Sequence, residues 1–141
     1  MPKNDSIFII LQKLTTDSTT NMSSHLELGI RGETLAEHYL RQKGYQILER
    51  NWRFSRAEID IIAKDGSILV FVEVKTRSSD IFGEPEESVS PKKEALLKDA
   101  ASVYMEQIDH QWEIRFDIIS ILIKREGDSI EHYKDAFFSE W

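Results

Sequence analysis

The stretch Ile68–Arg77 limits most strongly how this chain can fold. Its first half, Ile68–Val72, is an unbroken apolar run rich in β-branched side chains, which is typical of a strand buried on both faces within a sheet. Beyond the run, Glu73, Lys75 and Arg77 fall on every second position, so their side chains share one face of the strand. A carboxylate and an ammonium at the end of a buried strand cost free energy unless they pair or bind an ion. The strand therefore ends either in a functional site or in a surface ion pair between Glu73 and Lys75.

The patterns around this strand predict an α/β domain with the element order αβββαβ. Ser90 and Pro91 supply an N-cap and a first-position proline for the second helix, and Gly44 is a plausible stop for the first. This order predicts a mixed central sheet flanked by helices. The expected helices cover residues 26–43 and 91–107, the expected strands cover residues 45–54, 57–64, 68–76 and 112–123, a polar loop covers 77–90, and a short edge strand is expected near 130–133.

The N-terminal residues are expected to lie outside the folded domain. The chain has 141 residues, which is the size of a single domain. Residues 1–24 include a run of Thr, Ser, Asp and Asn without an apolar period. This composition predicts a flexible leader over residues 1–24, in front of a folded domain over residues 25–141.

Two features of the composition bear on where the protein works. The longest apolar runs are much shorter than a bilayer-spanning helix requires. Cysteine is absent, which excludes disulfides and thiolate metal sites and fits a reducing cytosol. We therefore expect a cytoplasmic protein without a membrane partner.

A second acidic cluster precedes the buried strand. Glu58 and Asp60 are expected on one face of their strand, with Ile59 and Ile61 on the other. A tight turn joins this strand to the next, so antiparallel pairing would bring Asp60 within reach of Glu73. Two carboxylates from adjacent strands form a hard oxygen site that suits Mg²⁺ or Mn²⁺. Glu58 is the weaker ligand candidate, because a surface charge at the strand entry explains it as well.

The first helix offers a further acid. On a helical projection Glu33 falls among apolar positions that include Ile30, Ala36 and Leu40. A glutamate within an apolar arc indicates a buried ligand, although Glu37 lies close to the same direction. A glutamate at the boundary of the core remains the alternative.

The ordered set of acids resembles the PD-(D/E)xK nuclease superfamily, which has the restriction-endonuclease-like fold. The match consists of Asp60 on one strand, Glu73 and Lys75 on the next, and Glu33 on the preceding helix. More closely, the chain resembles the YraN family of endonucleases, which are similar to archaeal Holliday-junction resolvases. The segments that carry this closer resemblance are Gly32-Glu33 with Ala36, Gly44-Tyr45, Asn51-Trp52-Arg53, Glu58-Ile59-Asp60, Phe71 to Arg77, and Arg115-Phe116-Asp117.

The resemblance covers roughly residues 26–123 and departs from the family patterns at two positions. Ile59 stands where the superfamily name has proline, and Ala57 stands where the YraN pattern usually has glycine. The second difference bears on backbone freedom more than on chemistry.

The resemblance implies a metal-dependent phosphodiesterase. Asp60, Glu73 and Glu33 would hold Mg²⁺ or Mn²⁺, which polarises the phosphate and lowers the pKa of bound water. Lys75 would orient the attacking water or stabilise the developing negative charge. All four residues are therefore the candidate catalytic set.

A basic stretch with interleaved aromatics indicates a nucleic-acid partner, with DNA favoured. Arginine suits phosphate contacts, while Trp52 and Phe54 either stack on unpaired bases or belong to the core. The formal net charge of −7 argues against nonspecific coating of DNA but permits a local basic patch. The candidate nucleic-acid-binding residues are Arg50, Arg53, Arg56, Arg77 and Lys92.

Other chemical signals in the sequence are weaker. The histidines His25, His38, His110 and His132 lack metal-ligand spacing, so a zinc site is not expected. Arg115, Phe116 and Asp117 are expected to supply an ion pair and a core aromatic, with direct substrate contact as the lesser alternative.

Three functions remain open on these residues. The leading hypothesis is a divalent-metal-dependent endonuclease that hydrolyses DNA, with branched or flapped DNA as a candidate substrate. The first rival is a nucleic-acid-binding module of the same fold with little or no catalysis, and the second is a structural domain. The sequence leaves open DNA versus RNA and monomer versus homodimer.

Overall fold

The structure, a computed structural model, describes residues 21–78 and 89–137 and shows an α/β domain. The elements follow the predicted αβββαβ order, and the expected edge strand completes the sheet. Residues 1–20 of the predicted leader (1–24) and residues 79–88 of the predicted loop (77–90) lie outside the described residues, while residues 21–24 belong to the first helix instead. The elements are α2 (Asn21–Gln42), β1 (Gln46–Phe54), β2 (Ala57–Asp65), β3 (Ile68–Ser78), α3 (Pro91–Gln107), β4 (Ile114–Ile123) and β5 (Ser129–Tyr133).

The five strands form one mixed sheet in the order β1-β2-β3-β4-β5. All neighbouring strands are antiparallel except β3 and β4, which are parallel. Parallel neighbours need a long crossover, and here the crossover contains α3. The mixed sheet flanked by helices confirms the predicted fold class and is consistent with a restriction-endonuclease-like core.

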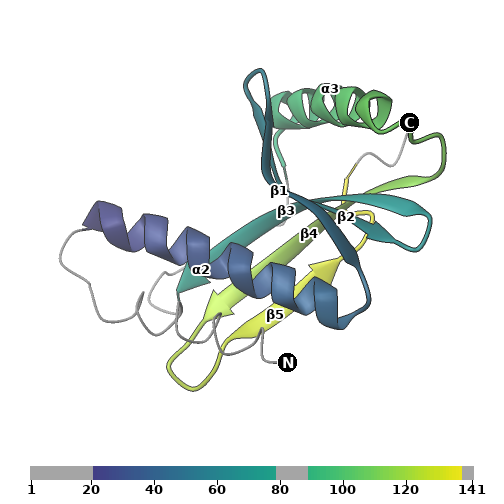
Figure 1. Cartoon of the computed structure of the whole chain (residues 1–141). Helices are drawn as coiled ribbons and strands as arrows, with labels where there is room; N and C mark the ends of the chain where they lie inside the picture. The colour runs from purple at the N-terminus through teal and green to yellow at the C-terminus, as the bar shows by residue number, and fades with distance from the viewer. Residues whose placement is uncertain (1–20, 79–88, 138–141) are drawn as a thin grey trace.

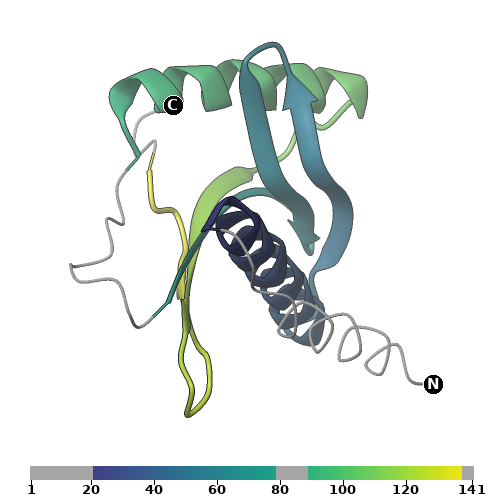
Figure 2. The same ribbon diagram turned by 90° about the vertical axis from the view of Figure 1, so that its left-hand side faces the viewer.

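The two helices cover opposite faces of the sheet (Figures 1 and 2). Val70 of β3 packs in a core cluster with Leu40 of α2, whereas its neighbour Phe71 packs in a second cluster with Tyr104 of α3. Successive side chains of a strand point to opposite faces, so an apolar run is needed where both faces are covered. The run at the start of β3 is therefore buried on both sides, as predicted.

The first helix begins earlier than predicted and ends where expected. It starts at Asn21 rather than Leu26, because extending an existing helix adds a hydrogen bond per residue even without an apolar pattern. It stops before Gly44, which adopts φ 89° and donates its N–H to the carbonyl of Arg41 at 3.0 Å. Neither α2 nor α3, the helices within the described residues, combines the length and apolar content that crossing a membrane requires.

The second helix begins with the predicted cap. Ser90 accepts a hydrogen bond on Oγ from the backbone N–H of Lys93 at 3.2 Å, and Pro91 occupies the first helical turn. This cap fixes the backbone of Lys93 in the first turn of α3.

The prediction that Ile59 and Ile61 share a face of β2 is wrong. Ile59 packs in the cluster beneath α3, while Ile61 packs in the cluster beneath α2. The cause is a break in strand regularity at Asp60. Opposite this position on β1, Asn51 adopts φ 51°, a left-handed conformation that does not continue a strand.

The same break separates the end of the β1–β2 hairpin from β3. The ladder between β2 and β3 runs from Asp65 opposite Ile68 to Ile61 opposite Val72, and the outer part of β2 pairs with β1 alone. Figure 2 shows this outer part of the hairpin extending alongside α3. Asp60 therefore lies at the fork where β2 leaves β3.

Candidate metal centre

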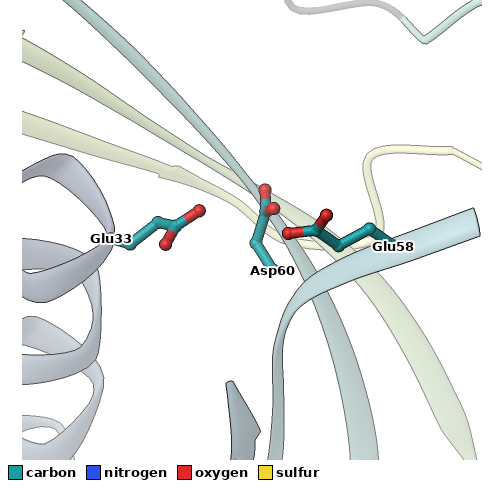
Figure 3. Close-up of side chains that lie close together, drawn as sticks. All are labelled: Glu33, Glu58 and Asp60. Carbon is teal, nitrogen blue, oxygen red and sulfur yellow. The ribbon is translucent and has the colours of Figure 1, made fainter. Parts of the chain in front are cut away.

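Three carboxylates from two elements converge at this fork. Glu33 comes from α2, and Glu58 and Asp60 come from the outer part of β2. One carboxylate oxygen of each lies within 4.8 Å of the others, and Figure 3 shows Glu33 and Glu58 directed toward Asp60 from either side. All three residues are half-buried. Three carboxylate oxygens this close offer hard donors to a single small cation.

The fork gives Asp60 a fixed position beside β3. Its Oδ2 accepts a hydrogen bond from the backbone N–H of Val74 at 2.8 Å, which takes the place of a ladder bond beyond the last pair of β2 and β3. Burial raises the pKa of Asp60 to about 8, and the negative charges of Glu73 and Glu33 add to the rise. The hydrogen bond from Val74 and the charge of Lys93 oppose it. The charged form of Asp60 is therefore disfavoured in the metal-free protein, and a bound cation would favour it.

Glu73 lies beside this cluster and is held from the opposite helix. Its side chain is 12% exposed and forms an ion pair with Nζ of Lys93 in the first turn of α3. The ion-pair alternative names Lys75 as the partner of Glu73, whereas the structure pairs Glu73 with Lys93. Lys75 follows two positions later on the same face of β3 and is half-buried. Lys92, a predicted nucleic-acid-binding residue, is exposed in the first turn of α3.

Two of the predicted nucleic-acid-binding arginines lie directly at the acids. Arg50 Nη2 is 3.5 Å from Glu33 Oε2, and Arg53 Nη2 is 3.0 Å from Glu58 Oε2. Arg53 remains 76% exposed, so its guanidinium is accessible to solvent despite the contact. Arg56 is exposed at the hairpin turn, and Arg77 is half-buried on β3.

Asn51 is a site residue that the sequence analysis missed as such. With its amide nitrogen facing the acids, Asn51 donates to Glu58 Oε1 at 3.1 Å and to both carboxylate oxygens of Glu33 at 3.2 Å. A signal was available, because asparagine is enriched at positive φ and stands within an otherwise regular strand pattern. The amide bridges carboxylates of two different elements.

The two aromatics of the hairpin differ in their surroundings. Trp52 packs against the α3 core cluster, with its ring 5.1 Å from that of Tyr104 in an edge-on arrangement. Phe54 stacks on Trp52 at 6.4 Å and remains 40% exposed. The half-buried Trp52 thus packs with the core, and Phe54 is the more exposed of the two.

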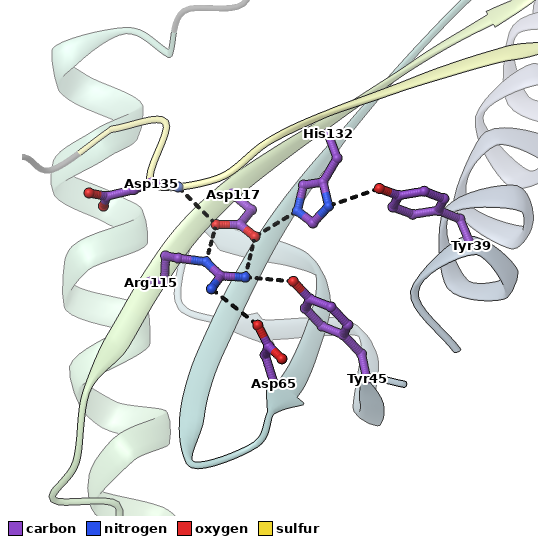
Figure 4. A network of polar contacts seen from close by, with 7 residues as sticks. All are labelled: Tyr39, Tyr45, Asp65, Arg115, Asp117, His132 and Asp135. Carbon is purple, nitrogen blue, oxygen red and sulfur yellow. Dashed lines mark hydrogen bonds and ion pairs between the residues drawn. The ribbon is translucent and has the colours of Figure 1, made fainter. Parts of the chain in front are cut away.

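A second polar cluster lies around the fully buried Asp117 of β4 (Figure 4). Its Oδ1 accepts hydrogen bonds from Arg115 Nε at 2.8 Å and from the backbone N–H of Asp135 at 3.0 Å. Its Oδ2 lies 3.0 Å from Arg115 Nη2 and 2.7 Å from His132 Nε2. Burial acts to raise the pKa of Asp117, but the hydrogen bonds from His132 and Arg115 outweigh it and lower that pKa.

The donors of this cluster are themselves tied to other elements. Arg115 donates to Tyr45 Oη at 2.7 Å and pairs with Asp65 at 3.3 Å, and His132 Nδ1 lies 3.3 Å from Tyr39 Oη. Both carboxylate oxygens of the central aspartate already accept two hydrogen bonds. The cluster therefore joins α2, β4 and β5. The predicted ion pair of the Arg115 segment and its core aromatic, Phe116, are confirmed.

The fold and the carboxylate cluster define a class of protein. This is an α/β domain with a restriction-endonuclease-like core and acidic side chains gathered at the fork where β2 leaves β3. The chain belongs to the family described as "Uncharacterised protein family UPF0102", whose sequence profile matches residues 32–121. The matched range contains every residue of the candidate metal centre.

The relatives include UPF0102 proteins of several bacteria. Those of Christiangramia forsetii and Flavobacterium psychrophilum are 50% and 51% identical over 117 residues, which cover 83% of this chain and 98% of each relative. That of Thermodesulfovibrio yellowstonii is 49% identical over 115 residues, covering 82% of this chain and 99% of the relative. Among solved structures, Pyrococcus furiosus SfsA in complex with Ca²⁺ matches with a TM-score of 0.34 and 16% identity, over 76% of this chain and 62% of that chain.

Proposed function

We propose that this chain is a divalent-metal-dependent endonuclease that hydrolyses DNA phosphodiester bonds. The observation that carries the proposal is the convergence of Glu33, Glu58 and Asp60 at the fork between β2 and β3. Glu73 lies beside them, and Lys75 follows on the same face of β3. The resemblance to the YraN family and the PD-(D/E)xK superfamily implies a catalytic set of Glu33, Asp60, Glu73 and Lys75, and branched or flapped DNA as candidate substrates.

The donor set fits Mg²⁺ or Mn²⁺. Asp60, Glu33 and Glu73 would hold the ion, with Glu58 as an additional ligand, because hard cations prefer carboxylate oxygens. The raised pKa of Asp60 supports this fit, because a cation that replaces the proton stabilises crowded carboxylates. A bound divalent ion would neutralise phosphate charge and make a water molecule more acidic.

Groups of the protein itself would stabilise the developing charge and position the metal ligand. Lys75 would direct its ammonium at the phosphate, where it stabilises the negative charge that grows on the nonbridging oxygens. The Val74 N–H holds Asp60 in place at 2.8 Å, so that its carboxylate needs little reorientation.

The nucleic acid would run along the hairpin and the start of α3. Arg53 and Arg56 stand exposed there, with Lys92 exposed on α3, and each can contact a phosphate. The open face of Phe54 can stack on an unpaired base. We place this activity in the cytoplasm, in keeping with a chain that contains no cysteine.

The test is a cleavage assay with the full chain on linear, flapped and four-way DNA in Mg²⁺ or Mn²⁺. Asp60→Asn and Glu73→Gln should each abolish cleavage, because they keep the side-chain shape and remove the charge that binds the cation. Lys75→Ala should lose turnover and retain Mn²⁺ binding in calorimetry. Glu126→Gln, at an exposed position, is the matched control and should cleave normally.

Two results would overturn the proposal. One is a wild-type chain that cuts none of these substrates at millimolar metal. The other is an Asp60→Asn variant that binds Mn²⁺ and cleaves as the wild type does.

A nucleic-acid-binding module without catalysis is the second candidate, and one observation favours it. Each glutamate of the centre already has a basic partner, in the pairs Arg50–Glu33, Arg53–Glu58 and Lys93–Glu73. Such pairs balance the charge of the site without a metal. This candidate is supported if the wild type binds DNA yet binds no Mn²⁺ in its presence.

A further inference from the structure

The two residues of the Lys93–Glu73 ion pair differ in solvent exposure. The side chain of Glu73, in the middle of β3, is 12% exposed, whereas the side chain of Lys93 is 47% exposed. The backbone of Lys93 is fixed, because its N–H donates to the N-cap Ser90. A long, flexible stem therefore carries an ammonium from a fixed helix turn to a nearly buried carboxylate.

The ammonium of Lys93 places a positive charge beside the acids, as a bound metal ion would. The ammonium pairs with Glu73, and its charge lowers the pKa of Asp60. Both acids are proposed metal ligands. A divalent cation on the same carboxylates would repel an ammonium a few ångströms away. The metal and Lys93 thus compete for Glu73.

Lys93, the more exposed residue of the pair, can also reach a ligand in solvent. The side chain of Lys93 is 47% exposed and lies beside the exposed Lys92 in the first turn of α3. An ammonium that leaves a carboxylate binds well to a phosphate. Arg53 is placed in the same way, because it is 76% exposed and pairs with Glu58.

We propose that Lys93 holds Glu73 in the metal-free protein and transfers to a phosphate of the nucleic acid when a divalent ion binds. This inference rests on the proposed metal centre. Its consequence is that metal and nucleic acid bind cooperatively, because each removes the competitor of the other. By linkage, the metal tightens DNA binding by the same factor by which DNA tightens metal binding, and such factors are typically about 5 to 150.

The experiment measures this coupling in a Lys75→Ala background, so that the DNA stays intact. Mn²⁺ affinity is determined by calorimetry with and without a four-way DNA, and we expect DNA to tighten it by about tenfold. Lys93→Met keeps the stem and removes the charge. It should bind Mn²⁺ several-fold more tightly than its parent without DNA, and DNA should then change that affinity less than twofold.

Lys98→Met is the matched control, because it removes an exposed ammonium from the same helix at a position outside the proposed binding surface. It should leave both the Mn²⁺ affinity without DNA and the coupling unchanged. If Lys93→Met destabilises the fold, Lys93→Gln replaces it, since an amide still donates a hydrogen bond to Glu73. Circular dichroism confirms which variant is folded.

The outcomes separate this inference from the proposed function. Cleavage and Mn²⁺ binding by the wild type, with equal coupling in the parent and the Lys93 variant, overturn the role of Lys93 alone. Weaker Mn²⁺ binding in the Lys93 variant without DNA does the same. No Mn²⁺ binding in any chain overturns the metal centre and the inference together.

Discussion

At the scale of single residues, Asn51 combines an unusual backbone with a bridging side chain. Its φ of 51° bends β1, and its amide donates to Glu33 and Glu58. Glycine keeps that backbone accessible but removes the amide, so Asn51→Gly should lower the free energy of unfolding by about 0.5–1.5 kcal/mol in metal-free protein. Asn51→Ala should lose more, because alanine is also strained at this φ. Urea denaturation of the three proteins measures both effects.

Added Mn²⁺ makes the test of Asn51 specific. A cation would hold the same carboxylates that the amide bridges, so saturating Mn²⁺ should recover most of the stability lost in Asn51→Gly. An alanine variant as stable as the glycine variant would show that the backbone of this residue matters less than its geometry indicates.

Asp60 should make the metal-free protein less stable as pH rises. Its pKa increases from 3.8 to about 8 on folding, so between these values the folded chain holds a proton that the unfolded chain has lost. Stability from this group is therefore present below pH 4 and is lost as pH rises toward 8. Guanidinium unfolding at pH 5 and pH 8 should show a smaller decline for Asp60→Asn than for the wild type. An equal decline in the two proteins would assign the pH dependence to other groups.

At the scale of elements, a close approach of α2 to β3 depends on Gly32. A β-carbon at Gly32 would overlap the hydroxyl oxygen of Thr76 and lie 2.7 Å from its Cβ. The adjacent Glu33 reaches Glu58 and Asp60 because α2 lies this near the sheet. Gly32→Ala should destabilise the fold by about 1–3 kcal/mol and weaken Mn²⁺ binding. Chemical denaturation and calorimetry provide the two measurements.

Gly29 supplies the control for this prediction within the same helix. A β-carbon at Gly29 meets nothing within 4 Å, so Gly29→Ala should leave stability unchanged or raise it by up to about 1 kcal/mol through helix propensity. Thr76→Ala combined with Gly32→Ala should recover part of the loss, because the overlapping hydroxyl is gone. A Gly32→Ala protein as stable as Gly29→Ala would contradict the close approach.

The elements themselves were predictable because their signals are local. The apolar run of β3, the cap at Ser90 and the stop at Gly44 each depend on a few neighbouring residues. The faces of Ile59 and Ile61 were not predictable by alternation, since alternation assumes a regular strand. The left-handed residue that breaks the strand lies on the neighbouring strand, outside any local pattern.

At the scale of the whole molecule, the buried Asp117 joins the far strands of the sheet to α2. Its carboxylate accepts from Arg115, from His132 and from the backbone of the segment after β5. Asp117→Asn would leave Arg115 without its buried counter-charge, so it should cost about 3–5 kcal/mol of stability. Guanidinium denaturation tests this. Asp128→Asn, which removes the partner of Arg31 at the surface, should change stability by less than about 1 kcal/mol.

A small effect of Asp117→Asn would mean that neutral hydrogen bonds suffice at this position. The lowered pKa of Asp117 gives a second measurement. Its contribution to stability is present above the unfolded pKa near 3.8 and is lost as pH falls below it. Acid unfolding of the wild type should therefore be steeper than that of the asparagine variant.

The candidate site was only partly visible in the sequence, for reasons that lie in long-range packing. Asp60 and Glu73 were singled out because they lie on strands joined by a tight turn. Lys93 reaches Glu73 only because α3 packs on that face after a long crossover, and Glu58 reaches Asp60 only because the hairpin bends. His132 meets Asp117 across β4 and β5, which no spacing in the sequence encodes.

The bend in β1 has a further consequence for how the protein behaves in a crowded cell. β1 is an edge of the sheet, and a straight edge strand is a template on which other chains can build amyloid-like stacks. The left-handed Asn51 and the register shift between Ile47 and Glu49 both interrupt that template. The residue that bridges Glu33 and Glu58 therefore also guards the edge of the sheet against self-association. A mutation that straightened β1 would lose the bridge between two carboxylates and at the same time leave the edge strand uninterrupted.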